Sequence, residues 1–235
     1  MSYLNWIDDK QLQEAVKHLL LKANEAQHKA QKDFTKNVID PFSTLFEMAG
    51  FDIEYNAWLE SEKTRQAQKT LLNHVGEFHQ NILGCVKGWT NLTKGNVVDI
   101  LSEEKKVIGE IKNKYNTISG GKLAELYSSL EKLVMPKASV YKGYTAYYVV
   151  IVPKKPQRFN REFTPSDKEK GEKCALNEKI REIDGASFYA LVTGDENALE
   201  NLFDVLPTVI KAVSKNTKQL PEKQKLKEFF KKAFE

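Results

Sequence analysis

The sequence has little of what marks secreted, membrane-bound or zinc-binding proteins. Its 235 residues include only two cysteines, Cys85 and Cys174, which lie far apart and form no Cys/His pair at zinc-binding spacing. No apolar run approaches the roughly 18–20 residues that a membrane helix needs. The N-terminal residues 1–6 lack the basic region and apolar core of a signal peptide. We therefore expect a protein of the reducing cytoplasm with no membrane partner.

Histidine is also scarce. The four histidines are His18, His28, His74 and His79, and none is spaced four residues from another, as in a helical metal-binding pair. We interpret the first three as surface or packing residues.

The hydrophobic content of the chain is sufficient for a folded core. Hydrophobic residues make up 41% and charged residues 29% of the chain, and the net charge is only +4. This length suits one large domain or two small ones. We divide it into a helical N-terminal region (1–70) for packing and dimerisation, a core (71–214) and an amphipathic C-terminal helix (215–235).

The first third reads as helical. Apolar spacing predicts a helix over residues 8–31, with Asp8 or Asp9 as its cap. A second helix is predicted over 33–48, interrupted near Asp40-Pro41 and stopped near Gly50, because proline disturbs the preceding turn. A third is predicted over 55–85, broken into segments. We expect this region to serve as a scaffold and dimer surface.

The middle of the chain alternates strands and helices. Two short strands are predicted over 95–101 and 107–114, then a helix over 122–133, a strong strand over 144–152 and a short strand over 179–183. Helices over 186–192 and 195–213 and one starting at Pro221 follow. The helix between the second and third strands permits a parallel crossover. We predict an α/β (α+β) fold with a mixed central sheet flanked by helices.

Acidic residues stand in two of these strands, where they are unusual. Asp99 directly follows two valines, and Glu110 and Lys112 share one face of a strand because side chains alternate. Such acid–lysine pairs recur in this chain, for example Asp8/Lys10, and most are solvated surface pairs. Only the Glu110/Lys112 pair stands out, because it is embedded in an apolar run. A buried charge needs a partner, and a divalent metal between the two carboxylates supplies one.

The spacing of these residues resembles a nuclease motif. Asp99, ten intervening residues and Glu110-Ile111-Lys112 match the PD-(D/E)xK nuclease signature, with Val98 in place of its proline. The continuation to Thr117, and the segments Gly76–Gly84 and Ile183–Gly194, resemble the type II restriction endonucleases that cut at GGNCC sites. The resemblance covers residues from about 71 to about 207.

This resemblance implies a restriction-endonuclease-like core and Mg²⁺-dependent hydrolysis of both strands of duplex DNA, leaving 5′-phosphate ends. Asp99, Glu110 and the main-chain carbonyl of Ile111 would hold Mg²⁺, and Lys112 would act on the attacking water. Glu77 would join the site from a helix, or else is a surface residue. A homodimer and a cognate DNA methyltransferase are the implied partners.

DNA contacts are expected in two places, after the catalytic strand and in the basic, proline-containing stretch 153–174, which is predicted to be a long loop. The candidate residues are Asn113, Lys114, Asn116, Thr117, Lys122, Arg158, Arg161 and Arg181. Arginine and lysine suit guanine and asparagine suits adenine, but for each residue taken alone we prefer the interpretation as a phosphate contact or a surface charge.

Two alternatives stay open at this point. The acids could be structural ion pairs in a non-catalytic DNA-binding or regulatory protein, in which case Mg²⁺ would not matter. The same motif also occurs in repair and junction-resolving nucleases, which would not cut plain duplex DNA into discrete bands.

Overall fold

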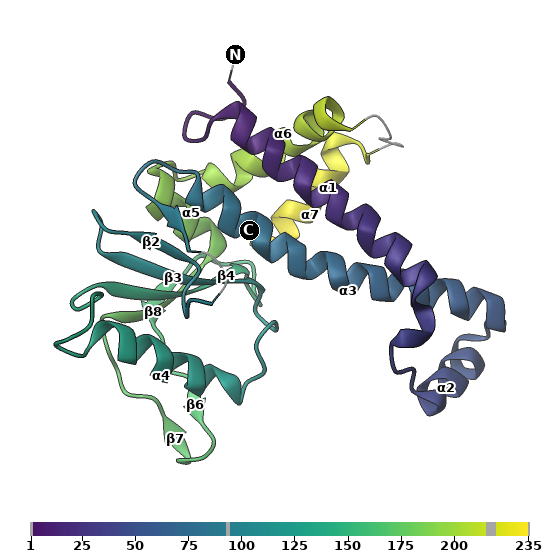
Figure 1. The fold of residues 1–235 in the computed structure, drawn as a ribbon, viewed down its shortest axis with the longest axis horizontal. Helices are drawn as coiled ribbons and strands as arrows, with labels where there is room; N and C mark the ends of the chain where they lie inside the picture. Colours follow the sequence, from purple (N-terminus) through teal and green to yellow (C-terminus); the bar gives the residue numbers. More distant parts are fainter. Residues whose placement is uncertain (1, 93–94, 215–219, 235) are drawn as a thin grey trace.

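A six-stranded mixed sheet lies at the centre of the computed structural model, which describes residues 2–92, 95–214 and 220–234 (Figure 1). The strand order is β1-β2-β3-β4-β8-β5, with bounds β1 Thr90–Asn91, β2 Ile100–Ser102, β3 Val107–Lys114, β4 Thr145–Val152, β8 Ile180–Asp184 and β5 Asn160–Glu162. Strands β3, β4 and β8 are parallel, and β2 and β5 are antiparallel to their neighbours. The prediction of a mixed sheet flanked by helices is confirmed.

Helices cover both faces of this sheet, and β4 shows why. Its sequence is aromatic and β-branched throughout, and its six central residues are all buried, as expected of a strand packed on both sides. Helix α4 (Lys122–Val134) makes the crossover from β3 to β4 and covers one face through Tyr127, Leu130 and Val134. The other face packs against α3 (Tyr55–Gly84) and α5 (Gly185–Thr193).

Helices α1 (Asp9–Lys32) and α3 pack along each other and extend away from the sheet as an arm (Figure 1). A short 3₁₀ turn, η1 (Phe34–Lys36), and helix α2 (Pro41–Phe51) form its tip. The interruption predicted near Asp40-Pro41 is confirmed: the chain is non-helical from Asn37 to Asp40, because Asp40 caps a new helix that starts at Pro41. Helix α2 also runs past Gly50, and α3 is continuous rather than broken.

The C-terminal helices pack back onto the chain. Helices α5 and α6 (Ala198–Val213) follow β8, and α7 (Lys223–Phe234) docks on α6 with the ring centroids of Phe203 and Phe230 5.2 Å apart. The boundary predicted at 70/71 falls inside α3, and the start of the segment predicted at 215–235 lies outside the described residues. No helix in the described ranges is long and apolar enough to span a membrane.

Two predicted segments differ from the structure. The first strand of the motif begins only at Ile100, five residues later than predicted, because residues 97–99 form a bend. The basic stretch 153–174 is less irregular than predicted: it contains β5 and the two-stranded hairpin β6 (Ser166–Asp167) and β7 (Glu172–Lys173).

Candidate active site

Asp99 is held in place by its own backbone and by β3. Its N–H donates to the carbonyl of Gly109 at 2.8 Å, and its carbonyl accepts from the N–H of Leu92 at 2.7 Å. The carboxylate then accepts the N–H of Ile111 at 2.6 Å. The backbone pairing of β2 with β3 ends at the Ile100–Gly109 pair, so the N–H of Ile111 has no backbone partner on β2 and donates to the Asp99 side chain instead. The bond directs the carboxylate toward the middle of β3.

Glu110 and Lys112 stand on one face of β3, the face that α4 covers. Their side chains form an ion pair with Nζ and Oε1 2.5 Å apart, and both are mostly buried, with 26% and 14% of the lysine and glutamate side chains exposed. Glu110 is in register with Tyr148 of β4, whose pKa is raised to about 12 by burial and by the charges of Glu182 and Glu110. The predicted acid–lysine pair is therefore a partly buried ion pair rather than a solvated one.

The two carboxyl groups interact directly. Burial and then the neighbouring charge of Asp99 raise the pKa of Glu110, and Lys112 opposes both, so the pKa stands at about 7. Burial also raises the pKa of Asp99, against the hydrogen bond from Ile111 and the charge of Lys112. The two side chains hydrogen-bond to each other. Two desolvated acids that resist ionisation together favour a cation between them.

Helix α3 supplies the opposite wall of the site. A cavity of about 410 Å³ opens between α3 and the end of β3, and Glu77, Gln80 and Lys112 all line it. Gln80 hydrogen-bonds to the carboxylate of Asp99, and Glu77 is 2.8 Å from Nδ1 of His74. The structure thus brings Glu77 into the same cavity as Lys112.

Three lining residues of α3 were not among the predicted site residues: Lys69, Asn73 and Gln80. Their spacing from Glu77 is the signal that could have found them. Residues 69, 73, 77 and 80 recur every three or four positions and so share one helix face. His79, which points to the other side, is buried against Tyr189, with its Nδ1 2.9 Å from the tyrosine hydroxyl.

The predicted DNA contacts after β3 fall in the same cavity. Asn113, Lys114, Asn116 and Thr117 all line it. The hydroxyl of Thr117 accepts the N–H of Lys114 at 3.2 Å, which closes a tight turn after the strand. Lys122, the first residue of α4, does not line this cavity.

The three predicted arginines lie elsewhere. Arg158 bonds to Ser187 and Glu196, Arg161 pairs with Glu182, and Arg181 bonds to Asn160. Strand β5 is three positions from β3 in the sheet, roughly 14 Å away at the usual strand spacing. These arginines are therefore engaged by the chain itself, outside the catalytic cavity.

The donor atoms of the cavity fit a hard divalent cation. Asp99 and Glu110 do not line the cavity themselves, but their partners Gln80 and Lys112 do, so their carboxylate oxygens lie at its edge. No group of three or more His, Cys, Asp or Glu side chains suited to a metal occurs among the described residues. Two carboxylates with a main-chain carbonyl, such as that of Ile111, leave several positions to water. This is the ligand set that Mg²⁺ prefers, whereas zinc sites use nitrogen and sulfur.

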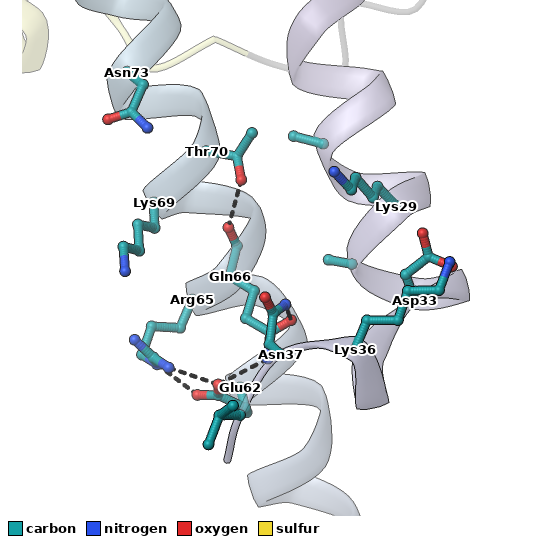
Figure 2. A pocket seen from close by; sticks show the side chains of 13 residues that line it. Lys29, Asp33, Lys36, Asn37, Glu62, Arg65, Gln66, Lys69, Thr70 and Asn73 are labelled. Atoms are coloured by element: carbon teal, nitrogen blue, oxygen red, sulfur yellow. Dashed lines mark hydrogen bonds and ion pairs between the residues drawn. The ribbon is translucent and has the colours of Figure 1, made fainter. Parts of the chain in front are cut away.

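A second, larger cavity of about 570 Å³ lies between α1 and α3, farther along the arm (Figure 2). Lys29, Asp33 and Lys36 reach it from the α1 side, and Arg65 lies on α3 with its guanidinium bonded to Glu62. Lys69 and Asn73 line both cavities. The two acids of the larger cavity, Asp33 and Glu62, pair separately with Lys36 and Arg65. Asp99 and Glu110 instead interact with each other at the edge of the smaller cavity, and we assign the chemistry there.

Comparison with known proteins gives a consistent result. The model of the Eco47II restriction endonuclease family matches residues 4–215. The type II restriction enzyme Eco47II of Escherichia coli is 51% identical over 213 residues, which cover 91% of this chain and 89% of that enzyme. The type II restriction enzyme Sau96I of Staphylococcus aureus is 32% identical over 212 residues, covering 88% of this chain and 80% of that enzyme.

Proposed function

Because the chain belongs to the Eco47II restriction endonuclease family and is a type II restriction endonuclease, we propose that Asp99, Glu110 and Lys112 form its catalytic centre. The reaction class requires DNA as substrate and a divalent metal ion. The proposal concerns which residues do the work, which metal is used and which sequence is cut.

Asp99 and Glu110 are the metal ligands in this proposal, together with the carbonyl of Ile111, and the metal is Mg²⁺. When bound, Mg²⁺ lowers the pKa of a coordinated water and neutralises charge on the scissile phosphate. Lys112, as the ammonium that pairs with Glu110, positions the attacking water, and its positive charge offsets the negative charge that develops on the phosphate. Glu77 and Gln80 hold the water and the Asp99 carboxylate from the α3 side.

The expected products are 5′-phosphate and 3′-hydroxyl ends at a GGNCC-type site. A target with twofold symmetry requires one catalytic centre for each strand, which a homodimer provides. A methyltransferase of the same specificity would protect the host DNA, and the enzyme would act in the cytoplasm. Asn113, Lys114, Asn116 and Thr117 are the DNA contacts that the cavity favours.

One observation carries this assignment. Lys112 Nζ lies 2.5 Å from a carboxylate whose pKa is raised to about 7, beside a second carboxylate that accepts the N–H of Ile111. An ion pair used only for stability gains nothing from a second buried acid. A metal site does, because the cation offsets the repulsion between the two acids.

The test is digestion of a plasmid of known sequence with Mg²⁺ and with EDTA, followed by mapping of the ends. We expect discrete fragments with 5′-phosphates in Mg²⁺ and none in EDTA. The variants Asp99→Asn, Glu110→Gln and Lys112→Ala should each lose at least about 10³-fold in cleavage rate, while binding to a cognate duplex in Ca²⁺ persists.

Glu103→Gln is the matched control, because Glu103 is an exposed acid two residues before a lysine in the turn between β2 and β3. It should cleave at the wild-type rate. Wild-type activity in any of the three site variants would overturn the assignment, and discrete cleavage in EDTA would overturn the metal. Cleavage confined to branched DNA would favour a junction-resolving nuclease.

A further inference from the structure

Helix α2 presents an apolar face to solvent at the tip of the arm. Phe42, Leu45 and Phe46 are 73%, 62% and 77% exposed, and Ala49 beside them is also exposed. Their spacing of i, i+3, i+4 and i+7 is the stripe that a helix normally turns toward a core. We call these four residues the α2 patch. None of the residues of α2 is buried.

The patch is preformed rather than loosely attached. Asp40 caps α2 through the N–H groups of Phe42 and Ser43, and the Glu47 carboxylate accepts the indole N–H of Trp58 at 3.0 Å. Trp58 is itself buried in α3. These contacts hold the polar side of α2 against the arm, so the apolar side faces outward with little ordering left to lose on binding.

The exposed area is of interface size. Val38, Phe51 and Tyr55 also lie at or next to the tip of the arm and are 101%, 70% and 59% exposed. Together with the patch they expose roughly 700 Å² of side chain, against about 800 Å² that each partner buries in a standard protein–protein interface. Patches of this size are unusual on monomers and mark association sites.

The charges near the patch argue against DNA as the occupant. Residues 38–55 include four acids, Asp40, Glu47, Asp52 and Glu54, and no lysine or arginine. A polyanion is repelled by such a surface, since DNA-binding surfaces neutralise phosphates with basic residues. The neighbouring cavity in Figure 2 is basic on balance: Lys29, Lys36, Arg65 and Lys69 line it together with two acids, Asp33 and Glu62, which pair with Lys36 and Arg65. An acidic tip beside a basic pocket is complementary to a twofold-related copy of itself.

We propose that the α2 patch is the surface through which two copies of this chain associate. This inference rests on the proposed function, which needs a second catalytic centre for the second DNA strand. The described residues bring together one Asp99–Glu110–Lys112 set per chain. Along α3, Tyr55 lies roughly 33 Å from Glu77, so the interface is remote from the catalytic cavity and the two can be altered separately.

The test is sedimentation velocity of the full chain without DNA across the micromolar range, comparing wild type with Phe42→Ser/Phe46→Ser. Both side chains are exposed, so the fold should persist, as circular dichroism will check. We expect a wild-type dimer and an association weakened by at least about 30-fold in the variant, as for aromatic residues central to an interface. Leu176→Ser/Phe229→Ser is the matched control, since these side chains are 76% and 63% exposed, and it should remain dimeric.

The outcomes separate this proposal from that of the catalytic centre. Glu110→Gln should stay dimeric but inactive, whereas the patch variant should be monomeric yet still stabilised by Mg²⁺ in thermal unfolding. A patch variant that remains dimeric overturns the inference, as does a wild-type chain that stays monomeric with and without cognate duplex in Ca²⁺. A variant that keeps its dimer but loses DNA binding would assign the patch to DNA instead.

Discussion

Replacing Glu110 by glutamine should stabilise the metal-free protein while abolishing cleavage. Glu110 is mostly buried beside Asp99, and burial followed by the charge of Asp99 raises its pKa from 4.5 to about 7. Because one pKa unit corresponds to about 1.4 kcal/mol, ionising Glu110 in the folded state costs about 3 kcal/mol relative to the unfolded chain. Glutamine occupies nearly the same volume and carries no charge, so it avoids this cost.

The difference in unfolding free energy between the variant and wild type should grow as pH rises. A carboxyl group with a raised folded-state pKa contributes stability that is fully present below pH 4.5 and is lost as pH rises through about 7. The stability difference between Glu110→Gln and wild type should therefore be near zero at pH 4.5 and reach about 3 kcal/mol at pH 8. Urea unfolding in EDTA at several pH values measures it.

Added Mg²⁺ should largely cancel this advantage of the variant. A metal at 100 times its dissociation constant stabilises the folded state by about 2.7 kcal/mol, and this gain should appear in wild type and be largely lost in the variant. Glu103→Gln, in the exposed turn, should match wild type in both conditions. A difference that stays flat with pH, or a variant less stable than wild type at pH 8, would refute the account of the two acids as a strained pair.

Two further predictions concern stability. Burial lowers the pKa of His79 to about 4, so the stability that this residue contributes is lost as pH falls from 6.5 to about 4, opposite in sign to Glu110. His79→Gln retains a partner for the Tyr189 hydroxyl, and it should remove about 3 kcal/mol of that loss in urea unfolding. If the free energy of unfolding of the variant falls with acid as steeply as that of wild type, the prediction is wrong. Gly84→Ala should destabilise the protein by about 2 kcal/mol or more, because the added Cβ would lie 2.8 Å from the backbone nitrogen of Asn91. Gly50→Ala in helix α2 is the control: no atom lies within 4 Å of its added Cβ, so it should be neutral or slightly stabilising in the same assay.

The sequence alone determined the elements whose cues are local. Strand β3 runs over the predicted residues 107–114, and β4 starts one residue later than predicted. The shared face of Glu110 and Lys112 follows from strand geometry, since residues two apart point the same way. Helix α4 was also found within a residue of its end. These features depend on neighbours in the chain, so periodicity reveals them.

The wall of the cavity that helix α3 forms was decided only by tertiary structure. Lys69, Asn73 and Gln80 reach the cavity because α3 docks against the sheet over the end of β3, and no local pattern states which helix face will dock there. The same packing placed Arg158, Arg161 and Arg181 on or next to strands β8 and β5, outside the cavity and bonded within the chain.

Helix α2 shows the limit of sequence reasoning most clearly. The spacing of Phe42, Leu45 and Phe46 is that of a buried face, yet all three are exposed. Hydrophobic periodicity tells which side chains gain from leaving water, but not whether the surface that covers them belongs to the same chain. That was settled by where Glu47 and Trp58 bind α2 to the arm, which leaves the apolar side facing outward.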